Sequence, residues 1–283
     1  MKLGVFTVSM PDYSPEECLE KLHELAYDGV EWRITDDNGD SSVPDFWSGN
    51  RSSMTAHQLI KKADGLKKLA ASLNISMPSI AAYIDCSNLD DVKLHCEATQ
   101  AIGADNVRIS PGIYDENKNY IDQIDYAKRQ YAKTAEIAEQ YGVRVVIETH
   151  MGQLGPSMTK VMEILKDLPS KHVGIMWDPG NQIAEGMETY NMALDIAGEY
   201  LAEVHIKNLI WECCEHNDQH QAVWQASTCP VHKGIVDWPK LIAVLKKRNY
   251  DQWLFFEDFS TEQPLDIRLK ENLKWFKELI AAV

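Results

Sequence analysis

The sequence lacks the features that mark membrane-spanning, secreted and disulfide-stabilised proteins. No apolar run approaches the 18 residues of a membrane-spanning helix, and the first residues have neither a long apolar core nor a signal-peptidase pattern. We therefore predict no membrane span and no secretory signal. The six cysteines form no C-x-x-C pair, which favours a reduced, cytoplasmic setting over a disulfide scaffold.

Positive charge is also scarce. The chain has 28 lysines and arginines against 43 acidic residues, a formal net charge of −15. An acidic surface repels phosphate backbones, so nucleic acid is not an expected partner. No strongly basic cluster indicates a phosphate site, which favours a non-phosphorylated substrate. No Pro/Gly/Ser-rich linker and no internal repeat divides the chain, so residues 1–283 are expected to form a single domain.

The chain does contain a regular alternation of strand-like and helix-like segments. The run VRVVI at 143–147 is continuous and β-branched, as in a fully buried parallel strand. Eight strand–helix units in one domain predict a closed (β/α)8 TIM barrel of the α/β class. A doubly wound open sheet is the main alternative, but no G-x-G-x-x-G follows the first strand to indicate dinucleotide binding. The predicted strands are 3–8, 29–34, 75–81, 106–109, 143–147, 173–177, 202–206 and 253–256, and the predicted helices are 15–27, 55–73, 89–102, 121–141, 157–167, 185–199, 238–248 and 265–280.

Side chains that can bind a metal end four consecutive predicted strands. In a TIM barrel the active site lies at the C-terminal ends of the strands. Any one such residue alone is an ordinary strand terminus, whereas four on successive strands predict one divalent-metal site. Three carboxylates and one imidazole suit Mn²⁺ or Mg²⁺, with Zn²⁺, Co²⁺ and Fe²⁺ as alternatives. The four residues are Glu148 in VVIETH, Asp178 in GIMWDPGN, His205 in EVHIKN and Glu257 in LFFEDF.

Other polar residues near the strand ends are candidate substrate ligands. His150 and Lys207 each lie two residues past a predicted metal ligand, on the same face if the strand continues. The simpler alternatives are a loop histidine and a lysine paired with a carboxylate. Glu31 in GVEWR and Arg108 in NVRIS lie toward the ends of the second and fourth strands. For these the alternatives are an ion pair of Glu31 with Arg33 and a buried ion pair of Arg108 at the barrel rim.

These motifs and their order resemble the sugar phosphate isomerase/epimerase family in the xylose isomerase-like barrel superfamily. The matching stretches are DGVEWR, VVIETH, VGIMWDPGN, EVHIKN and KGIVDWPKLIAVLKKRNYDQWLFFE, and the resemblance spans essentially the whole chain. It implies that the four predicted ligands bind one divalent ion, commonly Mn²⁺. It also implies that Glu148 and Glu257 act as acid and base on opposite faces of the substrate.

The activity implied by the resemblance is isomerisation or epimerisation of a small sugar or polyol. A metal ion stabilises the enediolate that forms when a proton leaves the carbon next to a carbonyl, and a glutamate removes and returns that proton. Loss of a β-hydroxyl from the same intermediate is dehydration, so a lyase acting on a keto-polyol or an oxidised sugar is the alternative. Two other functions are disfavoured. An apurinic-site endonuclease would need several Zn²⁺ ions and a basic surface, whereas this chain is acidic and has ligands for one ion. A non-catalytic binding protein would not need four intact metal ligands.

Three features depart from the pattern or extend it. Many ketose epimerases carry a histidine three residues after the strand-six aspartate, where this chain has Asn181, a candidate substrate ligand without charge. The long 208–234 segment is expected to cover the pocket or to join subunits of a homo-oligomer, and its histidines fit no standard ligand spacing. The 36–53 loop lies on the active-site side, where Phe46 and Trp47 would either form an apolar wall against a sugar ring or cap the barrel.

Overall fold

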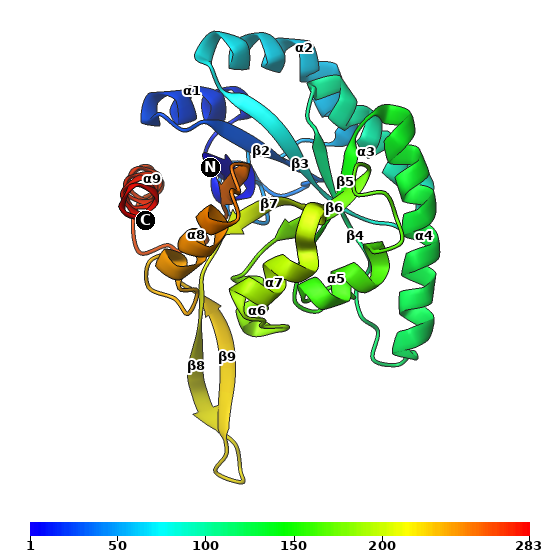
Figure 1. Ribbon diagram of the computed structural model, residues 1–283. Coiled ribbons are helices and arrows are strands. Elements are labelled where there is room, and N and C mark those ends of the chain that lie inside the picture. Colours follow the sequence, from blue (N-terminus) through cyan, green and yellow to red (C-terminus); the bar gives the residue numbers. More distant parts are fainter.

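A computed structural model describes all residues, 1–283, and contains a closed parallel barrel surrounded by helices (Figure 1). The strands follow the order β1-β10-β7-β6-β5-β4-β3-β2, so the first strand of the chain pairs with the last. The TIM-barrel prediction is therefore confirmed, and the open sheet is excluded. The barrel strands are β1 (Lys2–Phe6), β2 (Gly29–Ile34), β3 (Ser76–Asp85), β4 (Asn106–Ser110), β5 (Arg144–Glu148), β6 (Val173–Trp177), β7 (Leu201–Ile206) and β10 (Trp253–Phe256).

Amphipathic helices cover the outside of the barrel, and the main hydrophobic core lies between them and the strands. Ser14 and Glu17 form the capping box that starts α1, and Gly142 ends α4 with a positive φ of 67°. None of the helices combines the length and hydropathy needed to cross a bilayer. The helices are α1 (Pro15–Leu25), α2 (Ala56–Leu73), α3 (Leu89–Ile102), α4 (Tyr120–Tyr141), α5 (Met158–Leu165), α6 (Asn181–Ala184), α7 (Tyr190–Ala197), α8 (Trp238–Lys247) and α9 (Leu265–Ala282).

Two segments differ from the sequence-based expectation. The helix expected at 185–199 is shorter in the structure, where α7 covers Tyr190–Ala197, because Gly186 near the expected start has a φ of 88°, which an α-helix does not allow. The short helix α6 precedes this region and was not expected. The 208–234 segment contains an antiparallel hairpin, β8 (Leu209–His216) and β9 (Ala222–Thr228). Figure 1 shows this hairpin projecting away from the barrel, with its tip far from the other elements.

Aromatic side chains of β10 fill part of the barrel interior. The rings of Trp253 and Phe255 are stacked, with centroids 5.4 Å apart. A Cβ on Gly4 of β1 would lie 2.5 Å from the Phe255 ring, so the absence of a side chain there makes room for the aromatic one. Inward-facing side chains of a TIM barrel form stacked layers. Glu257 lies two residues beyond Phe255, directly after the end of β10.

Candidate metal centre

The four predicted ligands meet at one end of the barrel. Glu148 is the last residue of β5, and His205 is the penultimate residue of β7. Asp178 and Glu257 directly follow the last residues of β6 and β10. In the barrel order these four strands are neighbours, so their ends deliver the side chains to one point. All four side chains are buried, and one ligand atom of each lies within 4.8 Å of the others.

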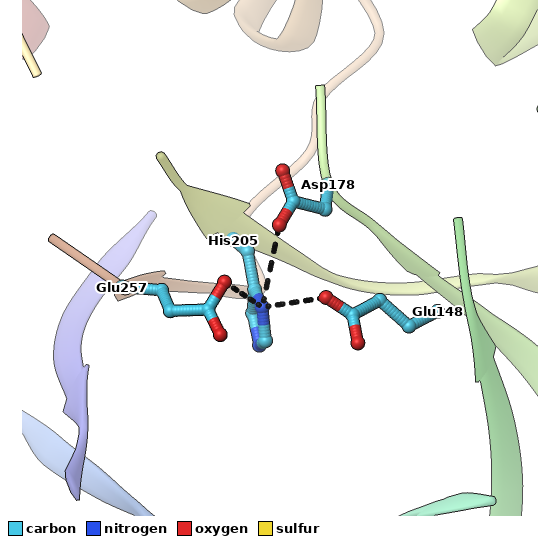
Figure 2. A group of neighbouring side chains, drawn as sticks. All are labelled: Glu148, Asp178, His205 and Glu257. Carbon is cyan, nitrogen blue, oxygen red and sulfur yellow. Dashed lines mark ion pairs between the residues drawn. The ribbon is translucent and has the colours of Figure 1, made fainter. Parts of the chain in front are cut away.

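The imidazole of His205 lies at the centre of this group (Figure 2). Its Nδ1 is 3.5 Å from Glu148 Oε1, 3.5 Å from Glu257 Oε2 and 4.0 Å from Asp178 Oδ2. Figure 2 shows the three carboxylates converging on the ring from three directions. The side chains therefore surround a common point and do not form separate ion pairs.

Two buried atoms of the cluster have no hydrogen-bond partner, His205 Nδ1 and Asp178 Oδ2. A buried polar atom without a partner costs about 1–3 kcal/mol, so such atoms call for an explanation. Both atoms face the centre of the cluster, where a cation would bind each of them. Three carboxylate oxygens and one imidazole nitrogen are a normal ligand set for a divalent ion. The residues present thus fit a divalent metal ion.

The pKa values of the carboxylates show which negative charges the protein groups compensate. Burial raises the pKa of Asp178 to about 8, and the carboxylates of Glu257 and Glu148 add to that effect. Burial also acts to raise the pKa of Glu257, but the Lys207 ammonium and the nearby His205 outweigh it and hold the value at about 2. Asp178 is therefore the acid whose charge is least compensated by protein groups.

A protein cation contacts each of the two glutamates. Arg108 Nη1 donates to Glu148 Oε2 at 2.6 Å, and Lys207 Nζ donates to Glu257 Oε2 at 2.7 Å. Lys207 Nζ also lies 3.5 Å from Asp178 Oδ2. Arg108 forms the buried ion pair at the rim that the sequence offered as one alternative. Lys207, likewise, is paired with carboxylates and also faces the cavity.

Glu31 holds His205 in its orientation. The Glu31 Oε2 atom is 2.8 Å from His205 Nε2, so the other ring nitrogen, Nδ1, points at the ligand cluster. Glu31 is fully buried, and Arg33 pairs with Asp37 at 3.0 Å, so the pairing of Glu31 with Arg33 considered above is wrong. A carboxylate on the far nitrogen of a ligand histidine fixes its tautomer and raises its basicity. The structure places Glu31 behind the histidine, outside the lining of the cavity.

Asn181 forms hydrogen bonds to two of the candidate metal ligands, Glu148 and Asp178. Its Nδ2 donates to Glu148 Oε1 at 3.1 Å and to the backbone oxygen of Thr149 at 3.3 Å. Its backbone N–H donates to Asp178 Oδ1 at 2.9 Å. Asn181 is fully buried and positions two ligand carboxylates, and it does not line the cavity.

A cavity of about 250 Å³ opens beside the cluster. Glu148 and Glu257 line it, together with Arg108, Lys207 and His150. No residue of the 208–234 segment does, because the hairpin projects elsewhere, and its histidines join no group of metal-binding side chains. The expectation that this segment covers the pocket is therefore wrong. Sequence reasoning named the cavity residue Trp47 only as one of two alternatives, and it missed the others, which are Ala82, Tyr83, Ser110 and Gln153.

Comparison with known proteins agrees with this architecture. The chain is 25% identical over 293 residues to an inosose dehydratase from Mesomycoplasma hyopneumoniae (strain 7448), which covers 95% of this chain and 90% of that protein. An uncharacterised protein from Methanocaldococcus jannaschii is 25% identical over 190 residues, 65% of this chain and 60% of its own length.

Two solved structures share the fold over almost their whole lengths. A D-tagatose 3-epimerase-like protein has a TM-score of 0.71 at 20% identity, covering 100% of this chain and 99% of that one. The IOLI protein with a binding zinc atom has a TM-score of 0.76 at 17% identity, also covering 100% and 99%. The family model described as xylose isomerase-like TIM barrel matches residues 19–279. This chain therefore belongs to the xylose isomerase-like TIM-barrel family.

Proposed function

We propose that this protein is a divalent-metal-dependent isomerase or epimerase that moves a proton on the carbon next to a carbonyl of a small sugar or polyol. The observation that carries the proposal is the position of two glutamates, Glu148 and Glu257, on either side of the ligand cluster and in the lining of one cavity. The D-tagatose 3-epimerase-like structure supports it as a neighbour in fold.

The residues that would hold the ion are Glu148, Asp178, His205 and Glu257. Mn²⁺ is the ion we propose, because a set of three hard oxygen ligands and one imidazole suits it. When bound, such an ion stabilises the negative charge that develops on the substrate oxygens after a proton is removed.

The proton transfers fall to the side chains of the chain itself. Glu148 and Glu257 are both in the ionised form, since Arg108 and Lys207 respectively outweigh the burial that raises their pKa values. An ionised glutamate within reach of a substrate C–H is a general base, and after accepting the proton it is the acid that returns it. Arg108 and Lys207 keep the two carboxylates fixed at 2.6 Å and 2.7 Å during this exchange.

Dehydration of a keto-polyol is the second candidate function, and the position of the Lys207 ammonium supports it. Its ammonium lies beside Glu257 in the cavity lining, where it can give a proton to a departing hydroxyl. Burial acts to lower the pKa of Lys207, but Glu257 and Asp178 raise it overall, so the proton is present at neutral pH. The inosose dehydratase, whose alignment covers 95% of this chain at 25% identity, also supports dehydration.

One experiment separates the two candidates. Mn²⁺-loaded protein is incubated in D₂O with a panel of ketoses, aldoses and keto-polyols, and the products are read by NMR and mass spectrometry. Deuterium next to the carbonyl, with the carbon skeleton and its hydroxyls retained, supports the isomerase or epimerase. Loss of water establishes the lyase instead. If no substrate exchanges a proton, the proposed chemistry is refuted.

A further inference from the structure

The loop between β2 and α2 is long and internally ordered. It spans residues 35–55 without a helix or strand, although loops beyond about 12–15 residues are uncommon unless they serve a function. The carboxylate of Asp37 accepts hydrogen bonds from the backbone N–H groups of Gly39, Gly49 and Asn50, at 2.8–3.0 Å. This carboxylate is only 8% exposed, so one buried acid ties together both ends of the loop.

The same loop is anchored to the barrel. Arg33 of β2 pairs with Asp37, and its Nη2 donates to the backbone oxygen of Trp47 at 3.2 Å. Asn50 Nδ2 donates to the backbone oxygen of Val8 at 3.0 Å. The Asp45 carboxylate accepts the backbone N–H of Trp47. The backbone of Trp47 is thus held on both its N–H and its carbonyl side.

This framework displays an exposed tryptophan at the cavity. Trp47 is 55% exposed and lines the same cavity as Glu148 and Glu257. Its ring rests against Phe259, with centroids 4.8 Å apart and an interplanar angle of 42°. Phe259 lies two residues past Glu257, and the Lys207 ammonium is 4.9 Å from its ring. Through its contact with Phe259, the indole is therefore positioned relative to Glu257 and Lys207.

Leaving a large rigid aromatic surface open to water is unfavourable unless something covers it, and such surfaces recur as the apolar walls of ligand sites. Ala82 and Tyr83 are the other hydrophobic residues of the lining, and the remaining seven are polar or charged, including Arg108, His150 and Gln153. A cavity that combines an aromatic surface with polar and charged groups matches a molecule with one C–H face and hydroxyls at its edge. A closed polyol ring has such a face, whereas an open-chain ketose of few carbons does not.

We infer that Trp47, held by the 36–53 loop, is a stacking subsite that selects closed-ring polyols over open-chain ones. This inference rests on the proposed function, because the ring would be presented to Glu148 and Glu257. The sequence left two possible roles for Trp47, an apolar wall of the substrate site or a cap of the barrel. The inference assigns it the first role.

The test is binding to the Mn²⁺-loaded protein, measured by isothermal titration calorimetry. The ring probes are 2-keto-myo-inositol and methyl α-D-glucopyranoside, and the open-chain probe is L-erythrulose. Trp47→Ala removes the indole, Trp47→Phe keeps an aromatic face, and Val43→Ala is the control because Val43 is a 75% exposed apolar residue of the same loop. Burial of one indole face predicts a Kd for the ring probes that rises about tenfold to thirtyfold in Trp47→Ala.

We expect Trp47→Phe and Val43→Ala to stay within about threefold of wild type, and erythrulose binding to be unaffected by all three changes. Ring binding within twofold of wild type in Trp47→Ala overturns the inference, as does failure of the wild type to bind either ring probe. An equal loss for ring and open-chain probes also overturns it, since that indicates a collapsed loop. If ring selectivity follows Trp47 but no probe exchanges a proton in D₂O, the stacking subsite holds and the proposed function fails.

Discussion

Replacing Asp178 with asparagine separates the proposed metal-binding role of this residue from its structural role. Without an ion, burial and the two glutamates raise the pKa of Asp178 to about 8, so the neutral acid predominates at pH 7. Asparagine is also neutral and keeps an oxygen that can accept the backbone N–H of Asn181. The melting temperature of the variant in EDTA should therefore stay within about 2 °C of wild type.

With Mn²⁺ the two proteins should diverge. At a free ion concentration 100 times the wild-type Kd, binding stabilises the native state by about 2.7 kcal/mol. One kcal/mol shifts the melting temperature of a protein of about this size by roughly 2–4 °C, so wild type should gain about 5–11 °C. Loss of one ligand of four should weaken binding at least about a hundredfold, because changes behind the ligands already cost 10–100-fold. At the same Mn²⁺ concentration the variant then gains about 0.4 kcal/mol, or about 1 °C.

The assay is thermal unfolding at pH 7 in EDTA and in a Mn²⁺ titration, followed by circular dichroism. Asp64→Asn is the matched control, because this aspartate is 88% exposed on α2 and far along the chain from the cluster. The control should respond to Mn²⁺ as wild type does. Equal Mn²⁺-induced shifts in Asp178→Asn and wild type would refute the assignment of the ion to this cluster.

Three further predictions follow from the site and its supporting loop. Glu148→Gln and Glu257→Gln should each lower turnover, measured as deuterium exchange, by about a hundredfold or more, and near-wild-type exchange in either would contradict the acid–base assignment. Glu31→Gln should weaken Mn²⁺ binding about 10–100-fold by calorimetry, because the His205 ring loses its charged partner, and a change under threefold would show that the partner is dispensable. Asp37→Asn should cost about 1–3 kcal/mol in urea unfolding at pH 7. Burial acts to raise the pKa of Asp37, but the amide hydrogen bonds and Arg33 lower it overall, so its contribution is complete above about pH 4 and is lost as the pH falls further. The difference between wild type and Asp37→Asn should therefore shrink at pH 3, and a constant difference would contradict this explanation.

The barrel and the clustering of the four candidate ligands were predictable because both depend on local sequence. Each strand is a short apolar run, and each predicted ligand lies at or next to the end of one. Strand order is then fixed by the repeating unit, so the ends of neighbouring strands had to meet. The four ligands could be named without any knowledge of distances, and the structure brings all four together.

The supporting contacts were not predictable because they join distant parts of the chain. Glu31 and His205 are 174 positions apart, and only the barrel geometry turns their side chains toward one another. The sequence placed Glu31 near Arg33 because the two are neighbours, whereas in the structure Arg33 serves the loop through Asp37. Likewise, the contact of Trp47 with Phe259 depends on the path of a 21-residue loop, and that path cannot be predicted from the hydrophobic periodicity of the sequence.

The distribution of the four candidate ligands along the chain has a consequence for when the proposed metal ion could bind. All four come from residues 148–257, and β10, which precedes the last ligand, is also the strand that closes the barrel against β1. During synthesis the first four strands therefore emerge without any ligand, and the complete set exists only once the final strand is available. An ion held by all four residues would therefore stabilise the closed barrel. Metal uptake should thus act as a late locking step of folding, and a fragment that lacks β10 should lose ring closure and ion binding together.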